Sequence, residues 1–388
     1  MVENVKPQLR PAKPYFSSGP CTKRPAWSPQ VLSDACLGRS HRSLVGREKL
    51  RDVIARSRKL LEVPENYRVG IVPASDTGAV EMSLWSLLGP RGVDIFSWES
   101  FGAGWVEDIV NQLKLPDVRV MDAVYGDIPE LAMWNPDRDL VFTWNGTTSG
   151  VCVPDGEWIS DDREGLTICD ATSAVFAMEL PWQKLDVVTW SWQKVLGSEA
   201  AHGMIALSPR AVERLETYSP IWPLPKIFRM TKKGKLIEGI FRGETINTPS
   251  MLSVEDVLDA LKWAEDLGGL SALISISKGN LDKISKWVAG SYWVDFLAKH
   301  PAIRSSTSVC LRITDAWFDA LSAENKSDVP RVMETLLEEE AAAFDINGYR
   351  DAPPGLRIWA GATVDTEDLE RLFPWLDWAY ETVKNKML

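Results

Sequence analysis

Short apolar runs alternate with amphipathic stretches between residues 67 and 206 of this chain. Six of the runs are too short for helices and rich in β-branched residues, which is typical of buried strands. They cover residues 67–72, 93–98, 140–144, 166–170, 187–192 and 203–207. Helical spacing follows the first two runs, at residues 79–88 and around 106–113. This alternation predicts an α/β fold, with a large three-layer domain built on a mostly parallel sheet.

The pattern changes after Asn247-Thr248-Pro249, where long amphipathic segments begin. Two helices are expected at about 253–267 and 270–297, and they carry the chain out of the large domain. A strand at 308–313, a helix at 329–344, a strand at 356–359 and a closing helix at 366–384 complete a smaller α+β C-terminal domain. We therefore expect an N-terminal arm at 1–20, a large domain at 21–260 and a small domain at 261–388.

The composition of the chain argues against several classes of protein. The net charge of −11 argues against a nucleic-acid-binding surface, which needs clustered Lys and Arg. The five cysteines are odd in number and form no C-x-x-C pair, so neither a disulfide framework nor a metal site is predicted. The polar, Pro-rich N-terminus lacks the apolar core of a secretory signal, and no apolar run reaches the roughly 20 residues of a membrane span. We expect a cytoplasmic protein that binds neither nucleic acid nor membrane.

Lys194 is the first candidate for chemistry. It follows the predicted strand at 187–192 and is bracketed by small and polar residues in TWSWQKVLGSEAAHG. Burial disfavours an ammonium ion and lowers its pKa, and a neutral amine can attack a carbonyl to form a Schiff base. The alternative is a surface lysine that extends from a strand end into solvent.

Asp170 is the second candidate, because it ends another predicted strand. Ligands of open α/β sheets bind beyond the carboxyl ends of the strands, so Asp170 and Lys194 can face one crevice. A carboxylate beside the ring nitrogen of pyridoxal phosphate keeps that nitrogen protonated, while a lysine forms the imine and moves the proton. Asp170 alone would more often be a helix N-cap, and only its combination with Lys194 favours the catalytic interpretation.

The segment from Ala74 to Gly78 lies between a predicted strand and a predicted helix. Free backbone N–H groups at such a helix start can bind a phosphate, and the hydroxyls of Ser75 and Thr77 can assist. Asp76 is unfavourable beside a dianion and can instead cap the helix. The chain has neither the Walker sequence nor the dinucleotide G-x-G-x-x-G fingerprint after a strand, which speaks against a nucleotide-dependent enzyme.

Together these motifs resemble the phosphoserine aminotransferases, in class V of the fold-type I pyridoxal-phosphate enzymes. The resemblance covers nearly the whole chain. It includes F-S-S-G-P at residues 16–20, S-H-R at 40–42, D-A-T-S starting at Asp170 and S-W-Q-K ending at Lys194. It implies transfer of an amino group from L-glutamate to 3-phosphohydroxypyruvate, which gives 3-phosphoserine and 2-oxoglutarate in serine biosynthesis. A further role in pyridoxine biosynthesis stays open.

The resemblance also assigns roles to single residues. Lys194 matches the Schiff-base lysine and Asp170 the partner of the pyridine nitrogen, while Trp105 would stack on the cofactor and Thr147 would meet its ring oxygen. The residues implied on the cofactor's phosphate side are Asp76, Thr77, Gln193, Asn247 and Thr248. Asn247 and Thr248 usually reach across from the other subunit, so the resemblance implies a homodimer with shared active sites.

Arginines are the residues that the resemblance assigns to the substrates. Arg42 matches the glutamate-binding arginine and Arg357 the one that clamps the α-carboxylate, where a bidentate guanidinium fits the ligand. His41 and Arg350, together with Arg39 and Arg242, would add positive potential for a substrate phosphate.

Three departures from the better-known branch of the family weaken the substrate prediction. The glycine-rich turn reads Ala74-Ser75-Asp76-Thr77, the acid of N-E-T is Gly146, and the H-R pair before the carboxylate clamp is Tyr349-Arg350. The alternative is another class V aminotransferase that acts on serine, alanine or glyoxylate without a substrate phosphate. A cysteine desulfurase is disfavoured because Cys310 falls inside a predicted strand, and a non-catalytic α/β binding protein would carry no cofactor.

Overall fold

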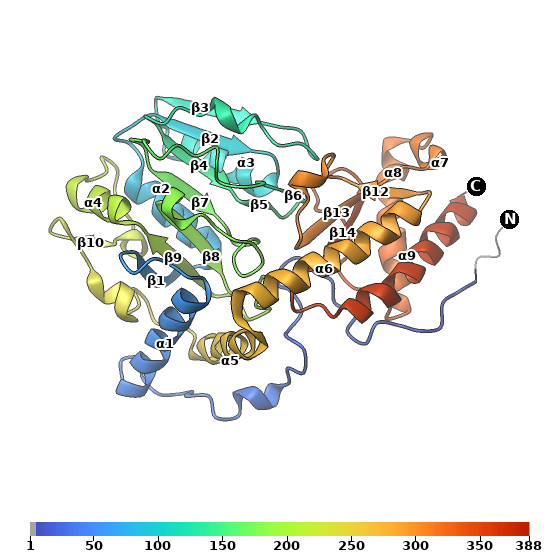
Figure 1. Ribbon diagram of the computed structural model, residues 1–388, viewed down its shortest axis with the longest axis horizontal. Coiled ribbons are helices and arrows are strands. Elements are labelled where there is room, and N and C mark those ends of the chain that lie inside the picture. Colours follow the sequence, from blue (N-terminus) through green and yellow to red (C-terminus); the bar gives the residue numbers. More distant parts are fainter. Residues whose placement is uncertain (1–4, 388) are drawn as a thin grey trace.

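A computed structural model of the chain describes residues 5–387 and centres on a seven-stranded mixed sheet (Figure 1). The strand order is β1-β9-β8-β7-β4-β2-β3. All neighbours pair in parallel except β9, which is antiparallel to both β1 and β8. The strands are β1 (Arg68–Pro73), β2 (Val93–Ser97), β3 (Val118–Asp122), β4 (Asp139–Thr143), β7 (Thr167–Asp170), β8 (Val187–Ser191) and β9 (His202–Leu207). The predicted α/β fold with a mostly parallel sheet is confirmed.

The central strands are apolar on both faces because helices cover both faces. Successive residues of β8 enter different cores: Val187 packs in the cluster around α2 (Ser75–Leu87), and Val188 packs in the cluster around α1 (Leu44–Leu60). This is the alternation of a strand in a three-layer arrangement. Helices α2, α3 (Ser100–Glu107) and α4 (Pro209–Thr217) share one core, and α1 with α5 (Met251–Leu267) contributes to the other.

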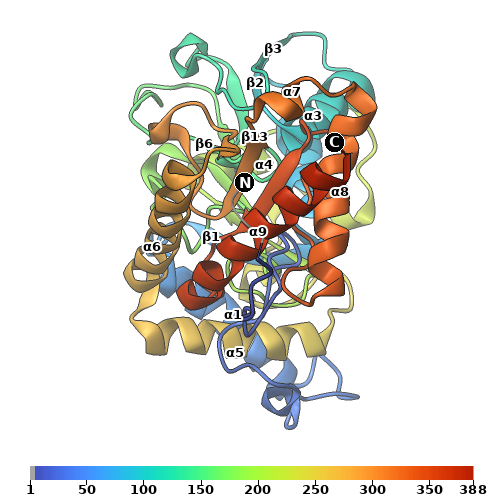
Figure 2. The same cartoon turned by 90° about the vertical axis from the view of Figure 1, so that its right-hand side faces the viewer.

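A second, smaller layer lies beside the main sheet (Figures 1 and 2). Its antiparallel sheet runs β12 (Val294–Phe296), β13 (Ser308–Ile313) and β14 (Gly355–Trp359). The helices α6 (Gly269–Gly290), α8 (Ala323–Glu339) and α9 (Thr366–Met387) pack around it. This matches the predicted α+β content, while the boundaries at residues 20 and 260 stay a prediction.

The N-terminal segment is an extended chain laid against this smaller layer (Figure 2). The Ala12 N–H donates to Asp368 on α9 at 2.6 Å, and the Trp359 N–H donates to the Phe16 carbonyl at 3.0 Å. Residues 1–4 of the predicted arm lie outside the described residues. The described part leads residues 18–20 toward the carboxyl edge of the main sheet.

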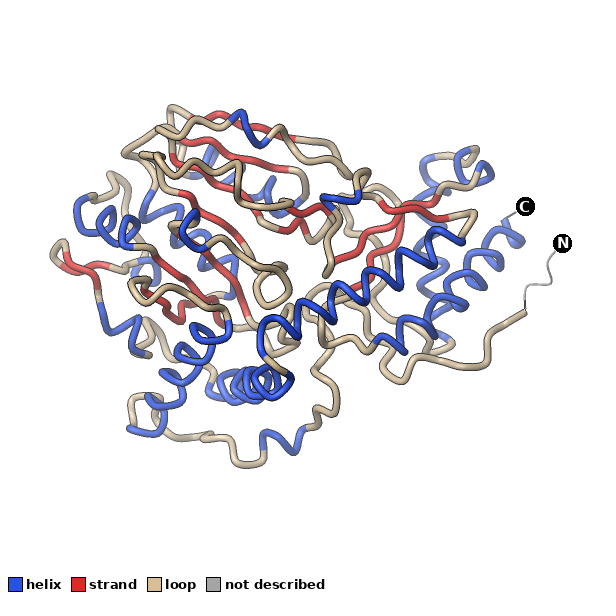
Figure 3. The backbone as a smooth tube through the Cα atoms, in the orientation of Figure 1, coloured by secondary structure: helices blue, strands red, loops and turns tan. Residues whose placement is uncertain are grey.

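Several element boundaries differ from the sequence prediction. Figure 3 shows the helices and strands along the backbone. The helix expected around 106–113 begins earlier, as α3, and ends in a π-helical turn at Asp108–Gln112. The helix expected at 270–297 ends at Gly290, because β12 begins at Val294. The helix expected at 329–344 is α8, which both begins and ends earlier. Among the described residues, no helix combines the length and apolar character needed to cross a membrane.

Candidate active site

The carboxyl edge of the main sheet gathers most of the residues predicted to carry chemistry. Strands β4, β7 and β8 are parallel neighbours that end at Thr143, Asp170 and Ser191, so the loops that follow them emerge side by side. Thr147 and Lys194 lie in two of these loops, and α2 starts at the same edge after β1. The topology therefore places these groups in the crevice where open α/β sheets bind ligands.

Lys194 is buried, with 8% of its surface exposed, and is not a solvent-directed surface lysine. Its Nζ donates to the main-chain oxygen of Ser18. Burial lowers the pKa of the Lys194 amine, and the positive charge of Arg357 acts in the same direction, although Cys21 and Asp170 oppose it. Gly19 is a close neighbour, since a Cβ at that position would overlap Nζ. A lowered pKa favours the neutral form of the amine, and the neutral form is the one that makes a nucleophilic attack.

Asp170 is 4% exposed and accepts two hydrogen bonds. The indole N–H of Trp105 donates to Oδ2 at 3.1 Å, and the Thr172 N–H donates to Oδ1 at 3.1 Å. The second contact is the local turn bond that a strand-ending aspartate commonly makes. The first joins α3 to β7, so Trp105 and Asp170 lie in direct contact in the structure.

The start of α2 offers unpaired backbone N–H groups. Ala74 and Ser75 adopt left-handed backbone conformations, with φ of 64° and 53°, and thereby turn the chain from β1 into the helix. Ser75 is half-buried and Thr77 is exposed at this helix start. The first residues of an α-helix have no intrahelical acceptor for their N–H groups, so an anion can be bound here.

Asp76 points inward from the same turn and is 6% exposed. Its pKa is raised well above the usual value by burial and then by the nearby charge of Asp170. Asp76 Oδ1 and Gln193 Oε1 are buried atoms that have no hydrogen-bond partner among the described residues. Two unpaired polar atoms beside a buried lysine indicate a place for a polar ligand.

Thr147 lies in the turn after β5 (Asn145–Gly146) and is 3% exposed. Its hydroxyl pairs with the hydroxyl of Ser173, which lies three residues after Asp170. The Thr147 carbonyl accepts from Ser308 Oγ at 2.6 Å. These contacts hold Thr147 between the main sheet and the small sheet.

Arg357 on β14 is the predicted substrate residue that lies nearest to this group. It lowers the pKa of Lys194, as noted above, and its Nε is buried without a hydrogen-bond partner among the described residues. The Tyr349 ring lies 5.5 Å from the guanidinium carbons of both Arg357 and Arg350. Arg350 is exposed and pairs with Asp351 at 3.5 Å. Within residues 5–387 no carboxylate forms an ion pair with Arg357, so this cation is available to an anionic ligand.

The remaining predicted residues are not joined to this group. His41 and Arg42 precede α1, where Arg42 is exposed and the pKa of His41 is lowered by burial and by the charge of Arg42. Asn247 and Thr248 are exposed in the loop before α5. Arg39 and Arg242 are also exposed. Within residues 5–387, no hydrogen bond links any of these side chains to Lys194 or Asp170.

Two features of the site were not predicted as site residues. Ser18 and Gly19 contact Lys194, and their signal was present in the F-S-S-G-P motif that the sequence carries. Glu99 is a buried carboxylate between β2 and α3. Its signal is the one that identified Asp170, an acid placed directly after a buried strand.

Comparison with known proteins decides the family. The phosphoserine aminotransferase of Methanosarcina mazei is 58% identical over 380 residues, which is 98% of this chain and all of that protein. The chain belongs to the phosphoserine aminotransferase family. The residues gathered at the carboxyl edge of the main sheet are therefore those of a phosphoserine aminotransferase family member. No protein-family model matches the sequence.

Solved structures of lower identity share the fold. A phosphoserine aminotransferase from Cytophaga hutchinsonii has a TM-score of 0.79 at 20% identity and covers 94% of this chain and 98% of its own. An alanine–glyoxylate aminotransferase from Nostoc sp. has a TM-score of 0.78 at 17% identity and covers 97% of both chains. The two scores are nearly equal, so the fold alone does not choose between a phosphorylated and an unphosphorylated substrate.

The residues present fit the cofactor of this family, pyridoxal phosphate. The start of α2, with its free N–H groups, would hold the phosphate, the buried carboxylate of Asp170 would face the pyridine nitrogen, and the buried Lys194, whose pKa is lowered, would hold the aldehyde carbon. The unpaired buried atoms of Asp76 and Gln193 lie in the same crevice. Each chemical feature of the cofactor thus has a matching group in the site.

Proposed function

We propose that this protein transfers the amino group of L-glutamate to 3-phosphohydroxypyruvate, giving 3-phosphoserine and 2-oxoglutarate for serine biosynthesis. The observation that carries the proposal is the full-length similarity to the Methanosarcina enzyme, combined with the buried Lys194–Asp170 pair. Neither a pyridoxine role nor an unphosphorylated substrate is needed to account for this similarity.

Pyridoxal phosphate supplies the carbonyl that takes up the amino group and a ring that accepts electrons when the substrate loses its Cα proton. Lys194 Nζ holds the cofactor and then moves that proton, a task that its lowered pKa favours. Asp170 keeps the ring nitrogen protonated through its negative charge. The indole N–H of Trp105 donates to Asp170 and so holds its carboxylate in place.

Anionic groups of the two substrates are bound by cations at the rim. Arg357 binds the α-carboxylate, because its guanidinium is free of internal carboxylates among the described residues and lies near Lys194. Arg350, with 81% of its side chain exposed, adds positive charge for the phosphate of 3-phosphohydroxypyruvate. Tyr349, where the family usually has histidine, supports both arginines through its ring face.

The active protein is proposed to be a homodimer with shared sites. Leu37, Leu44, Val45 and Leu252 are exposed with between 40% and 70% of their surface accessible. The segments that carry them are joined, because Glu255 on α5 accepts from both the Cys36 N–H and Lys49 Nζ. Their neighbours along the chain include Arg42, Asn247 and Thr248, and a second copy would bring these residues to a site they do not reach within one chain.

The proposed compartment is the cytoplasm. All five cysteines are free thiols, and burial raises the pKa of Cys21, Cys152 and Cys310 to about 12. Unpaired buried thiols are the usual state of cysteine in a reducing environment.

The reaction is tested by the visible absorbance of the purified protein. We expect a cofactor band that L-glutamate bleaches and 3-phosphohydroxypyruvate restores. The variant Lys194→Ala should lose turnover by several orders of magnitude, since one residue carries both the attachment and the proton transfer. Near-normal turnover in that variant would disprove the role of Lys194.

The rival activity is transamination of serine, alanine or glyoxylate. We compare kcat/KM for 3-phosphoserine and for serine as amino donors in the reverse direction. A preference for 3-phosphoserine supports the proposal, because arginine contacts to the phosphate are then used. A band that only an unphosphorylated keto acid restores would retain the aminotransferase and reject the phosphorylated substrate.

A further inference from the structure

Glu99 is a buried acid that the proposed reaction leaves without a role. It lies between β2 and α3 and is 4% exposed. Burial raises its pKa, while hydrogen bonds from Gly102 and Thr148 act in the opposite direction. In the described part of the chain no lysine, arginine or histidine pairs with it, so only N–H and O–H donors hold this carboxylate.

Both oxygens of Glu99 are used, and they reach different segments. Oε1 accepts from the Gly102 N–H at 2.7 Å and so caps α3. Oε2 accepts from Thr148 Oγ1 at 2.8 Å and from the Thr148 N–H at 3.3 Å. One side chain therefore fastens the start of α3 to the turn that follows β5.

Gly146 leaves the space that the Glu99 side chain occupies. A Cβ at Gly146 would lie 2.8 Å from Glu99 Cγ and 2.6 Å from Ser149 Oγ, closer than real contacts allow. The Glu99 side chain fills the space that a side chain at 146 would need.

We propose that Glu99 is a positioning residue of this aminotransferase, which fixes the start of α3 to the turn after β5 through its two carboxylate oxygens. The inference rests on the proposed function. Each segment that Glu99 holds carries one wall of the site: α3 carries Trp105, which contacts Asp170, and the turn carries Thr147, which contacts Ser173. Loss of the link would displace both walls relative to the cofactor.

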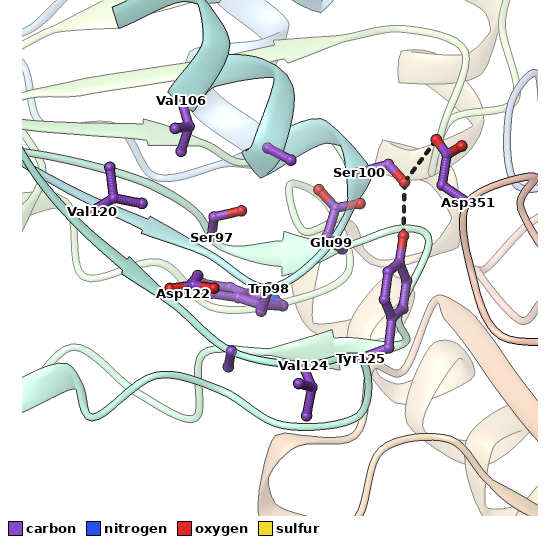
Figure 4. A pocket seen from close by; sticks show the side chains of 12 residues that line it. Ser97, Trp98, Glu99, Ser100, Val106, Val120, Asp122, Val124, Tyr125 and Asp351 are labelled. Atoms are coloured by element: carbon purple, nitrogen blue, oxygen red, sulfur yellow. Dashed lines mark hydrogen bonds between the residues drawn. The ribbon is translucent and has the colours of Figure 1, made fainter. Parts of the chain in front are cut away.

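The same network extends to the loop that carries Arg350. Thr148 Oγ1 lies 3.1 Å from the Tyr125 hydroxyl, and Ser100 Oγ lies 2.7 Å from that hydroxyl and 3.3 Å from Asp351 Oδ2. Figure 4 shows Glu99, Ser100, Tyr125 and Asp351 along the wall of a cavity of about 600 Å³. Asp351 in turn pairs with Arg350. Glu99 thus stands at one end of a chain of contacts from the cofactor side to the substrate loop.

The decisive variant is Glu99→Gln. An amide has the same shape, but its nitrogen must face the N–H of Gly102 or of Thr148, so one acceptor is lost. We expect the dissociation constant for pyridoxal phosphate to rise about tenfold or more and kcat to fall, because small displacements of positioned groups cost rate steeply. The pH midpoint of the cofactor band should also shift. Glu107→Gln, on the exposed side of α3, is the matched control and should leave all three values unchanged.

The wild-type protein separates this inference from the proposed function. A wild type that binds no pyridoxal phosphate rejects the function itself. If the wild type is active and Glu99→Gln lowers only the melting temperature, with dissociation constant, kcat and pH midpoint unchanged, the positioning role is overturned.

A second variant covers the case in which Glu99→Gln does not fold. Thr148→Val removes the hydroxyl donor from the other side of the contact and should raise the same dissociation constant, while Thr148→Ser restores it. Where both single variants fold, the loss in the double variant should be smaller than the sum of the two single losses, because the two side chains share one contact. Wild-type values in Thr148→Val would reject the inference.

Discussion

At the scale of single residues, the site depends on charges placed where water cannot reach them. Lys194 and Asp170 are both buried, and Arg357 has no internal carboxylate among the described residues. A folded protein gains little stability from such groups, because desolvation opposes their charged forms. The arrangement of these three charged groups fits the binding of ligands that together carry a phosphate, a carboxylate and a protonated ring.

The variant Arg357→Lys tests whether binding of the substrate α-carboxylate requires a planar guanidinium group. A lysine keeps the charge but loses the paired N–H groups that match a carboxylate. We expect KM for both amino acid substrates to rise about tenfold or more, with the cofactor band unchanged. Steady-state kinetics and an absorbance spectrum measure the two effects. Unchanged KM values would place the α-carboxylate elsewhere.

His202 provides a pH dependence of stability. Its ring is buried at the start of β9, accepts the Ser250 N–H at 2.9 Å, and has its pKa lowered from 6.5 to about 4 by burial. The unfolded chain takes up a proton as the pH falls through 6.5, whereas the folded protein does so only near 4. The free energy of unfolding should therefore decline across that window, by roughly 2 to 3 kcal/mol from this group.

The measurement is urea unfolding at several pH values between 7 and 4 for the wild type and for His202→Gln. Other groups titrate in both proteins, so the difference between the two curves isolates the histidine. Equal slopes would show that His202 is protonated at its ordinary pKa in the folded state.

At the scale of elements, the sequence predicted the buried strands most accurately. The strands β2, β4, β7 and β8 are buried on both faces and were found as apolar runs within a residue or two. The edge strand β3 was not predicted, because none of its side chains is buried and Arg119 interrupts its short apolar run. The helix α6 was predicted too long, since the apolar pattern continues past Gly290 into β12.

The candidate site was predictable to the same extent. Residues at strand ends, such as Asp170 and Lys194, stand in recognisable sequence positions, and the structure brings them together. The contact of Gly19 with Lys194 joins positions far apart in the chain, and periodicity carries no information about it. The place of Glu99 depends on the missing side chain at Gly146, which only the packed structure reveals.

The turn from β1 into α2 gives a prediction for an element. A Cβ at Gly78 would overlap the Pro73 carbonyl oxygen and the Ala74 Cβ, so the turn closes only around glycine. Gly78→Ala should destabilise the protein by about 1 to 3 kcal/mol and weaken cofactor binding, because the phosphate-binding N–H groups belong to this turn. Urea unfolding and cofactor titration measure the two effects.

The control is Gly279→Ala on α6, where no atom lies within 4 Å of the added Cβ. Alanine is the better helix former, so this variant should gain up to about 1 kcal/mol and bind the cofactor normally. A Gly78→Ala protein that behaves like the control would show that the turn adapts to a side chain.

At the scale of the whole molecule, one chain holds an incomplete set of the predicted residues. Lys194, Asp170 and Arg357 meet within the chain, whereas Arg42, Asn247 and Thr248 lie on an exposed surface near Leu44 and Leu252. Exposed apolar side chains beside unconnected polar ones are typical of an interface. A two-fold dimer would bury the exposed apolar side chains and place the polar ones in the partner's site.

Mixing two inactive variants tests this arrangement. Lys194→Ala lacks the cofactor-binding amine, and Arg42→Ala lacks the arginine expected to cross the interface. In a mixed dimer, the Arg42→Ala subunit contributes Lys194 and the Lys194→Ala subunit contributes Arg42, so one of the two sites is complete. After co-refolding of equal amounts, random pairing should restore about a quarter of the wild-type activity. If the mixture is no more active than the two variants assayed separately, Lys194 and Arg42 must serve the same site from the same chain, or the protein must act as a monomer. Sedimentation of the wild type separates these two explanations.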